Sequence, residues 1–313
     1  MHADNRRGIL AMSLAMALFI ANDALVKQVS ATLPGPQLIF IRGLMATTLV
    51  LIMAQAMGHL KNWRLMLNTK LWLRSAVDAA ASLTYLTAVF HLPLGNATAI
   101  NLASPLFITV FAIFFFKERV TVVRGGLILL GFSGVLLVVQ PSSEGFNIYA
   151  WIAVVATLLH ATRDTLTRGI GLHVPALLIS LSTAVSVALA AGSITLTQSW
   201  TPIDKQSLAL LFCASVFLSM AYYFLIVAMR SGEMSLVAPF RYSGLLFALL
   251  IGYVVWDEVP NALAWAGIFL LVISGLLILR SERSKAPHCF KILTTRNHRM
   301  DQNYNAIQTH DKK

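Results

Sequence analysis

Apolar segments long enough to cross a lipid bilayer follow one another along almost the whole chain. A transmembrane helix needs about 20 predominantly apolar residues. Ten segments approach this length: 9–30, 36–58, 71–91, 94–116, 123–140, 147–167, 173–196, 206–229, 234–256 and 262–280. A soluble core could not bury this much apolar surface, because 57% of the 313 residues are hydrophobic and only 12% are charged. The sequence therefore predicts an all-α polytopic membrane protein with ten transmembrane helices.

The connections between these segments differ in charge, and the difference predicts an orientation. One set holds Arg6, Arg7, Lys61, Arg64, Lys70, Lys117, Arg119, Arg124, Arg168 and Arg230. The other set holds Glu144, Asp204, Lys205, Asp257 and Glu258. Because Lys and Arg accumulate in cytoplasmic loops, both termini are expected to be cytoplasmic, in a multi-pass protein of the cell inner membrane. Residues 281–313 are expected to form a basic cytoplasmic tail suited to anionic lipid rather than nucleic acid.

A repeat with an offset of 140 or 141 residues relates the two halves of the chain. The segments NDALVK (22–27) and RDTLTR (163–168) have acidic and basic residues at matching places. The matching pairs are Asp23 and Asp164, Lys27 and Arg168, Glu118 and Glu258, Gly126 and Gly267, and Gly134 and Gly275. Each half then holds five spans, and an odd number inverts the second half in the membrane. Residues 8–140 and 147–280 are thus predicted to be two inverted five-helix repeats, with the segment around Asp23 retained in the mature fold rather than cleaved.

These motifs resemble the bacterial drug/metabolite transporter superfamily, in the ten-helix branch built from two EamA domains. The resemblance covers about residues 8–280 and rests on ASPLFITVFAIFFFKERV (103–120) and on the matching helix that ends at Glu258. The second half departs from the commoner pattern, since Leu245 stands where the first half has Pro105. Its APFRYSGLLFALLIGYVVWDE (238–258) resembles the subgroup of S-adenosylmethionine uptake carriers and riboflavin transporters. Within that subgroup, two first-half motifs are more similar to the riboflavin group: the opening RRGILAMSLAMALFIANDALVK and FIRGLMAT (40–47).

Several ionisable side chains fall inside the predicted spans. Such a group costs about 2.5–3.5 kcal/mol on insertion scales, so each should face the bundle interior and have a partner. By the helical rise, the outer half of the membrane holds Asp23 and Arg42, and the inner half holds Asp78, Arg163, Asp164 and Arg241. We expect Asp23 to pair with Arg42, and Asp78 or Asp164 with Arg241, either as static salt bridges or as pairs that exchange during transport. Lys27 is expected to reach the outer interface.

The remaining candidate site residues are one histidine and several aromatic side chains. Arg241, within APFRY, is expected to contact the substrate or to act as a gate. The resemblance places Tyr85, Tyr223, Phe240 and Tyr242 on spans around a central cavity, where a planar ring could stack; ordinary helix packing is the alternative. His160 lies one turn before Asp164 and is a candidate proton relay, with a structural role as the alternative. Glu118 and Glu258 are expected to serve packing and topology. No metal site or cofactor is expected.

A secondary carrier fits these features better than the two rival classes. A membrane-embedded enzyme would need a catalytic cluster at one depth, whereas the histidines in the spans are few and scattered. A channel would need a filter loop or a ring of subunits. Three acids balance three arginines in the interior, which favours a neutral or zwitterionic solute. The preferred substrate is riboflavin; S-adenosylmethionine, an amino-acid-like metabolite, a drug to be exported and a homodimeric assembly are left open.

Overall fold

The computed structural model describes residues 3–116, 122–140, 148–168, 170, 174–230 and 237–283, and within them every regular element is helical. Glu118, Glu144 and the tail from residue 284 lie outside the described residues. The elements are α1 (Ala3–Val29), α2 (Gly35–Ala56), η1 (His59–Leu67), α3 (Thr69–His91), α4 (Leu94–Asn101), α5 (Ser104–Phe116), α6 (Val122–Val139), α7 (Ile148–Arg168), α8 (Ala176–Thr195), α9 (Lys205–Arg230), η2 (Ala238–Tyr242), α11 (Ser243–Trp256) and α12 (Ala262–Arg283). Helices are favoured because lipid offers no hydrogen-bond partner to the backbone.

Two of the predicted spans are interrupted rather than continuous. The span expected over 94–116 is divided into α4 and α5, and the span expected over 234–256 contains the 3-10 segment η2 followed by α11. Each interruption lies beside a proline, Pro105 or Pro239, which lacks an N–H group and clashes with the carbonyl group four residues earlier. At the first break, the Ala103 N–H donates to the carbonyl oxygen of Ile100 at 3.0 Å, the tighter pattern of a 3-10 turn.

Four helices are by themselves long and apolar enough to cross a membrane. They are Arg6–Val29, Gly35–Ala56, Ala176–Thr195 and Lys205–Leu225. The interrupted spans contribute shorter apolar helices, Leu94–Ile108 and Phe240–Trp256.

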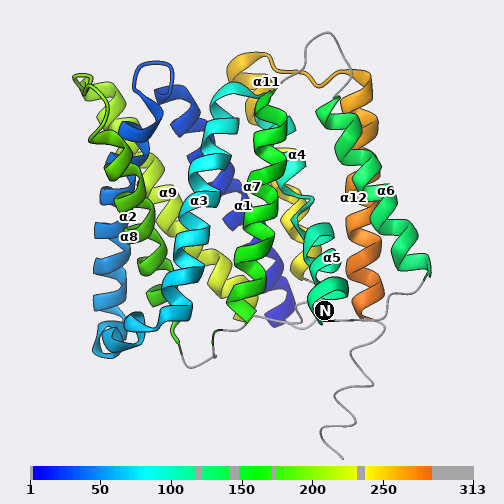
Figure 1. Ribbon diagram of the computed structural model, residues 1–313, viewed down its shortest axis with the longest axis horizontal. Helices are drawn as coiled ribbons and strands as arrows, with labels where there is room; N and C mark the ends of the chain where they lie inside the picture. The colour runs from blue at the N-terminus through cyan, green and yellow to red at the C-terminus, as the bar shows by residue number, and fades with distance from the viewer. Residues whose placement is uncertain are drawn as a thin grey trace, which may run out of the picture.

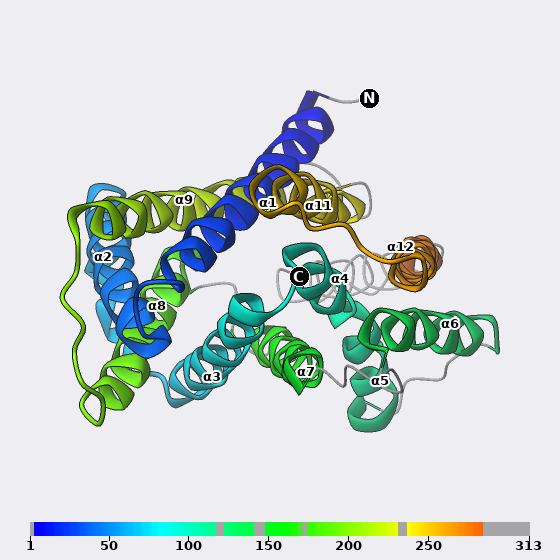
Figure 2. The same ribbon diagram turned by 90° about the horizontal axis from the view of Figure 1, so that it is seen from above.

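The helices stand roughly parallel and pack in pairs (Figures 1 and 2). The pairs are α1 with α9, α2 with α8, α3 with α7, and α6 with α12, while α4 contacts α11. The start of α1 and the end of α12 lie at the same end of the bundle (Figure 1), which we call the proximal end; the opposite end is the distal end. Successive spans run in alternate directions between these ends, so side chains distant in the sequence are brought to one depth.

Small residues allow α6 and α12 to approach each other closely. A Cβ atom added to Gly134 would lie 2.7 Å from the carbonyl oxygen of Gly267, and one added to Gly267 would lie 2.9 Å from Cβ of Leu137. Backbones in a membrane approach this closely where glycine leaves the interface free of side chains. Further along α12, a Cβ atom on Gly275 would overlap the phenol ring of Tyr242, so this glycine makes room for that ring.

Outside the spans, Asp204 caps the distal start of α9. Its Oδ2 atom accepts a hydrogen bond from the backbone N–H of Ser207 at 3.0 Å. This satisfies one of the N–H groups left without a partner in the first turn of a helix. Hydrogen bonds from the Ser207 hydroxyl and backbone hold the pKa of the Asp204 carboxyl below its usual value. The start of α9 is thus capped by the residue that directly precedes the helix.

Candidate functional site: polar side chains inside the bundle

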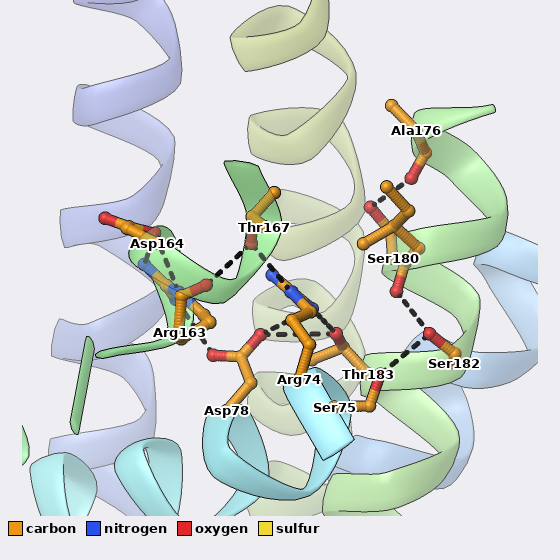
Figure 3. A network of polar contacts seen from close by, with 11 residues as sticks. Arg74, Ser75, Asp78, Arg163, Asp164, Thr167, Ala176, Ser180, Ser182 and Thr183 are labelled. Carbon is orange, nitrogen blue, oxygen red and sulfur yellow. Dashed lines mark hydrogen bonds and ion pairs between the residues drawn. The ribbon is translucent and has the colours of Figure 1, made fainter. Parts of the chain in front are cut away.

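Four charged residues form a network in the proximal half, where α3, α7 and α8 meet (Figure 3). Asp78 of α3 lies between two arginines: its Oδ1 is 2.8 Å from Nη1 of Arg163, and its Oδ2 is 3.0 Å from Nη1 of Arg74. Arg163 also holds Asp164, with Nη2 and Oδ1 at 2.9 Å. The side chain of Asp78 is only 2% exposed. All four charges are therefore paired within a mostly water-excluded region. We call these four residues the proximal network.

Hydroxyl groups tie the proximal network to the neighbouring helices. The Thr183 hydroxyl of α8 donates to Oδ2 of Asp78 at 3.2 Å and accepts a hydrogen bond from Arg74. Arg74 Nε donates to the Thr167 hydroxyl of α7 at 3.2 Å. Ser75, which follows Arg74, and Ser182, which precedes Thr183, share a hydrogen bond of 2.8 Å between their hydroxyls. The network consequently crosslinks three helices.

A second polar group lies further toward the distal end, on α1, α2 and α3. Asn22 joins the two charges of this group: its Oδ1 accepts from Nη1 of Arg42 at 3.1 Å, and its Nδ2 donates to Oδ1 of Asp23 at 2.9 Å. The Tyr85 hydroxyl donates to the other carboxylate oxygen of Asp23 at 3.4 Å. Arg42 is 6% exposed and is the strongest charge acting on Asp23. The expected association of Asp23 with Arg42 thus runs through an amide rather than a direct ion pair.

Lys27 of the opening motif makes an ion pair at the distal end. Its Nζ lies 2.5 Å from Oε1 of Glu258 and 4.8 Å from the ring centre of Trp256. The side chain of Lys27 is only 10% exposed. Lys27 therefore reaches the distal end of the bundle, where it pairs with the carboxylate of Glu258, a residue that follows α11.

Arg241 and its neighbours lie in and beside η2, at the interruption of the ninth predicted span. Arg241 is half-buried, and no ion pair or hydrogen bond joins it to a side chain in the part of the chain that the structure describes. The expected partners, Asp78 and Asp164, are held by the other arginines instead. Tyr242 is 8% exposed against α12, whereas Phe240 is 38% exposed. Arg241 is thus a cation without a protein partner among these residues.

His160 lies between the two polar groups but does not bond Asp164. Its Nδ1 donates to Oδ1 of Asn101 at 2.8 Å, and its ring packs at a tilt against Tyr85 with 5.6 Å between the centres. Arg241 and Asp164 act on His160 only through space. The His160–Asp164 relay is not formed as a hydrogen bond, and the contact with Asn101 is consistent with the structural alternative.

Sequence reasoning missed some of the residues that complete these groups. Arg74 was one: it is four residues before Asp78 in an apolar span, a spacing that places two side chains on one helix face and could have identified the pair. Tyr222, rather than Tyr223, interacts electrostatically with Arg42; Tyr223 is 39% exposed. No cluster of potential metal ligands occurs among the residues described.

The profile of the EamA-like transporter family matches residues 6–140 and again residues 147–280. Because these matches cover more than half of the sequence, the chain belongs to the EamA-like transporter family. The resemblance found in the sequence motifs is confirmed, and with it the expectation of a membrane transporter rather than an enzyme.

Individual relatives carry several transport activities in their names. The chain is 28% identical to the pseudopaline exporter CntI of Pseudomonas aeruginosa, over 89% of this chain and 98% of that protein. It is 30% identical to a riboflavin transporter of Rhizobium johnstonii, over 62% and 65%. It is 25% identical to an S-adenosylmethionine uptake transporter of Rickettsia conorii, over 61% and 65%.

A solved structure supports the architecture. A crystal structure aligns over 89% of this chain and 98% of its own with a TM-score of 0.62 and 16% identity. At this identity the likeness establishes the fold alone.

Proposed function

We propose that the protein is a secondary transporter that moves a small organic metabolite across the inner membrane by alternating access. Its working units are two inverted five-helix repeats, residues 8–140 and 147–280. The helix pairs support this. Under the 141-residue offset, the α1–α9 contact corresponds to α7–α3, α2–α9 to α8–α3, and α1–α11 to α7–α5, and each contact is present. The α2–α8 and α6–α12 pairs correspond to themselves, as a two-fold axis requires.

Polar residues at equivalent positions also contact each other. Position 183 is 141 residues after Arg42, and position 215 is 141 after Arg74. Arg74 of the first half donates to Thr183 of the second, and at the equivalent pair of positions the Ser215 hydroxyl of the second half donates to the backbone oxygen of Arg42 in the first at 3.2 Å. Two pairs of facing positions therefore correspond, although the side chains differ. The interrupted spans, 94–116 and 234–256, also occupy equivalent places, and discontinuous helices commonly carry the binding site in inverted-repeat transporters.

The solute that we propose is inferred from the charge of Arg241. Once Arg74 is included, the described interior has four arginines, Arg42, Arg74, Arg163 and Arg241, against three acids, Asp23, Asp78 and Asp164. The equal balance expected from the sequence is replaced by one excess positive charge, and Arg241 is the arginine for which the described residues provide no partner. A guanidinium group is suited to carbonyl or carboxylate oxygens. Riboflavin, whose flat ring carries two carbonyl oxygens, is the solute we propose to test first.

Export of an amino-acid-like metabolite is the second candidate. The relative named as a pseudopaline exporter aligns over 98% of its length, whereas the riboflavin transporter of Rhizobium johnstonii aligns over 65%. A carboxylate would match the unpaired charge of Arg241 more strongly than a neutral carbonyl.

Uptake of labelled riboflavin by riboflavin-auxotrophic cells tests the first candidate. Cells that express this chain are expected to accumulate label and to grow at low riboflavin, whereas cells with an empty vector do neither. Equal accumulation in both, with the protein present in the membrane, would reject riboflavin uptake. Comparison of the metabolites released into the medium by the same two strains would then test export.

The proposed orientation places both termini and the proximal end in the cytoplasm. Lys61 of η1 and Lys205 at the start of α9 are exposed at the proximal and distal ends. In a chain whose native cysteines are replaced, Lys205→Cys should react with an impermeant thiol reagent in intact cells, and Lys61→Cys only after lysis. The opposite pattern would reverse the orientation. Labelling of Ser143→Cys, whose position lies outside the described residues, should follow Lys205→Cys.

A further inference from the structure

The ion pair of Lys27 and Glu258 is part of a larger contact at the distal end. Besides Glu258, Lys27 Nζ donates to the carbonyl oxygen of Leu92 at 2.6 Å. The other carboxylate oxygen of Glu258 accepts from the backbone N–H of Leu94 at 2.8 Å. Two side chains thus hold both sides of the turn between α3 and α4.

The local backbone holds Glu258 in this position. Asp257 adopts the left-handed conformation, with φ at 53°, and ends α11. The N–H of Glu258 then donates to the carbonyl oxygen of Gly252 at 3.1 Å, which turns the chain back toward α4. A Cβ atom on Gly252 would lie 3.2 Å from the Glu258 carboxylate, so the small residue leaves space for it. The carboxylate also lies at the start of α4, where helix N–H groups favour negative charge.

This contact joins elements from both halves of the chain. Lys27 ends α1 and the Leu92–Leu94 turn follows α3, all in the first half, while Glu258 follows α11 in the second. The two side chains are 10% and 19% exposed. A partly buried pair with two further backbone hydrogen bonds is costly to break, because each charge would lose its partner inside the bundle.

We propose that Lys27, Glu258 and the Leu92–Leu94 turn form a latch that keeps the distal end closed. The latch rests on the proposed function, since alternating access requires the distal end to open in part of the cycle. Opening moves the ends of α1 and α11 apart and breaks the two contacts that join the halves, the ion pair and the hydrogen bond from the Leu94 N–H to Glu258. The state described here is therefore closed at the distal end.

Thiol accessibility measures the latch without measuring transport. Thr98 lies on α4 beyond the latch and is 5% exposed. With the native cysteines replaced, Thr98→Cys reports access to this depth when an impermeant thiol reagent is applied to vesicles of each orientation. Lys27→Gln and Glu258→Gln should each raise the labelling rate from the distal side at least tenfold and leave the proximal rate unchanged. Glu258→Gln keeps an acceptor for the Leu94 N–H and is the variant better able to fold.

Charge-matched variants separate the latch from a general loss of charge. Asp257→Asn removes the same charge one residue away and, because asparagine tolerates the left-handed conformation, should label like the parent; Lys205→Gln should do the same. The reversed pair Lys27→Glu with Glu258→Lys should still label fast, because it sets a carboxylate against the Leu92 carbonyl and an ammonium against the Leu94 N–H. Parental labelling of folded Glu258→Gln would overturn the latch, as would a rise equally large in Asp257→Asn. Neither result depends on whether any tested solute is transported.

Discussion

Replacing Asp78 with asparagine is expected to lower the free energy of unfolding by about 3–5 kcal/mol, the usual cost of removing one partner from a buried ion pair. Asp78 accepts from Arg74, Arg163 and Thr183, and its side chain is 2% exposed. The substitution leaves Arg74 without any carboxylate partner among the described residues and sets an amide N–H₂ group among donors. Reversible unfolding of the purified protein in mixed micelles measures the change.

Asp164 provides the matched control for this experiment. It belongs to the same network, but among the described residues its side chain bonds only Arg163, and that side chain is 28% exposed. Asp164→Asn should cost about 1 kcal/mol or less, as partly solvated pairs do. If the two variants unfold at the same denaturant concentration, Asp78 does not organise the contact between α3, α7 and α8.

Loss of the Arg241 guanidinium is expected to reduce transport strongly while leaving the fold intact. A hydrogen bond to a charged group contributes about 1.5–3 kcal/mol, which corresponds to a loss of roughly 10-fold to 100-fold on removal. We expect Arg241→Ala to fall near the upper figure. Arg241→Lys should fall about tenfold, because an ammonium cannot reproduce the planar pair of donors. Since no described carboxylate pairs with Arg241, neither variant should unfold more easily than the parent.

The measurement is the initial rate of solute movement divided by the amount of protein in the membrane. Arg64→Ala, on the exposed η1 segment, removes the same charge away from the interior and should transport like the parent. Parental transport by Arg241→Ala at normal abundance would exclude Arg241 from the binding site. Loss of abundance instead of rate would assign it a structural role.

Helices and the transporter family could be predicted from the sequence because both depend on local information. A run such as 71–91 is apolar enough to enter lipid and must satisfy its own backbone, so α3 ends at His91 as expected. The family follows from motifs that are contiguous in the chain. The prolines beside the interruptions of the spans 94–116 and 234–256 were also visible in the sequence. Whether a proline bends or breaks a helix depends, however, on the neighbours that donate hydrogen bonds to the freed carbonyl groups.

The partners of the interior charges were decided only by the tertiary structure. Counting residues along a span gives the depth of a side chain but not the direction in which it points around the helix axis. Asp78 and Arg241 were assigned to the same half of the membrane, yet Asp78 faces Arg74 and Arg163 instead. Lys27 likewise meets Glu258, 231 residues away, because α1 and α11 end together at the distal end. The sequence therefore determined that charges lie within the spans, whereas helix packing decided their partners and gave Arg241 none among the residues that the structure describes.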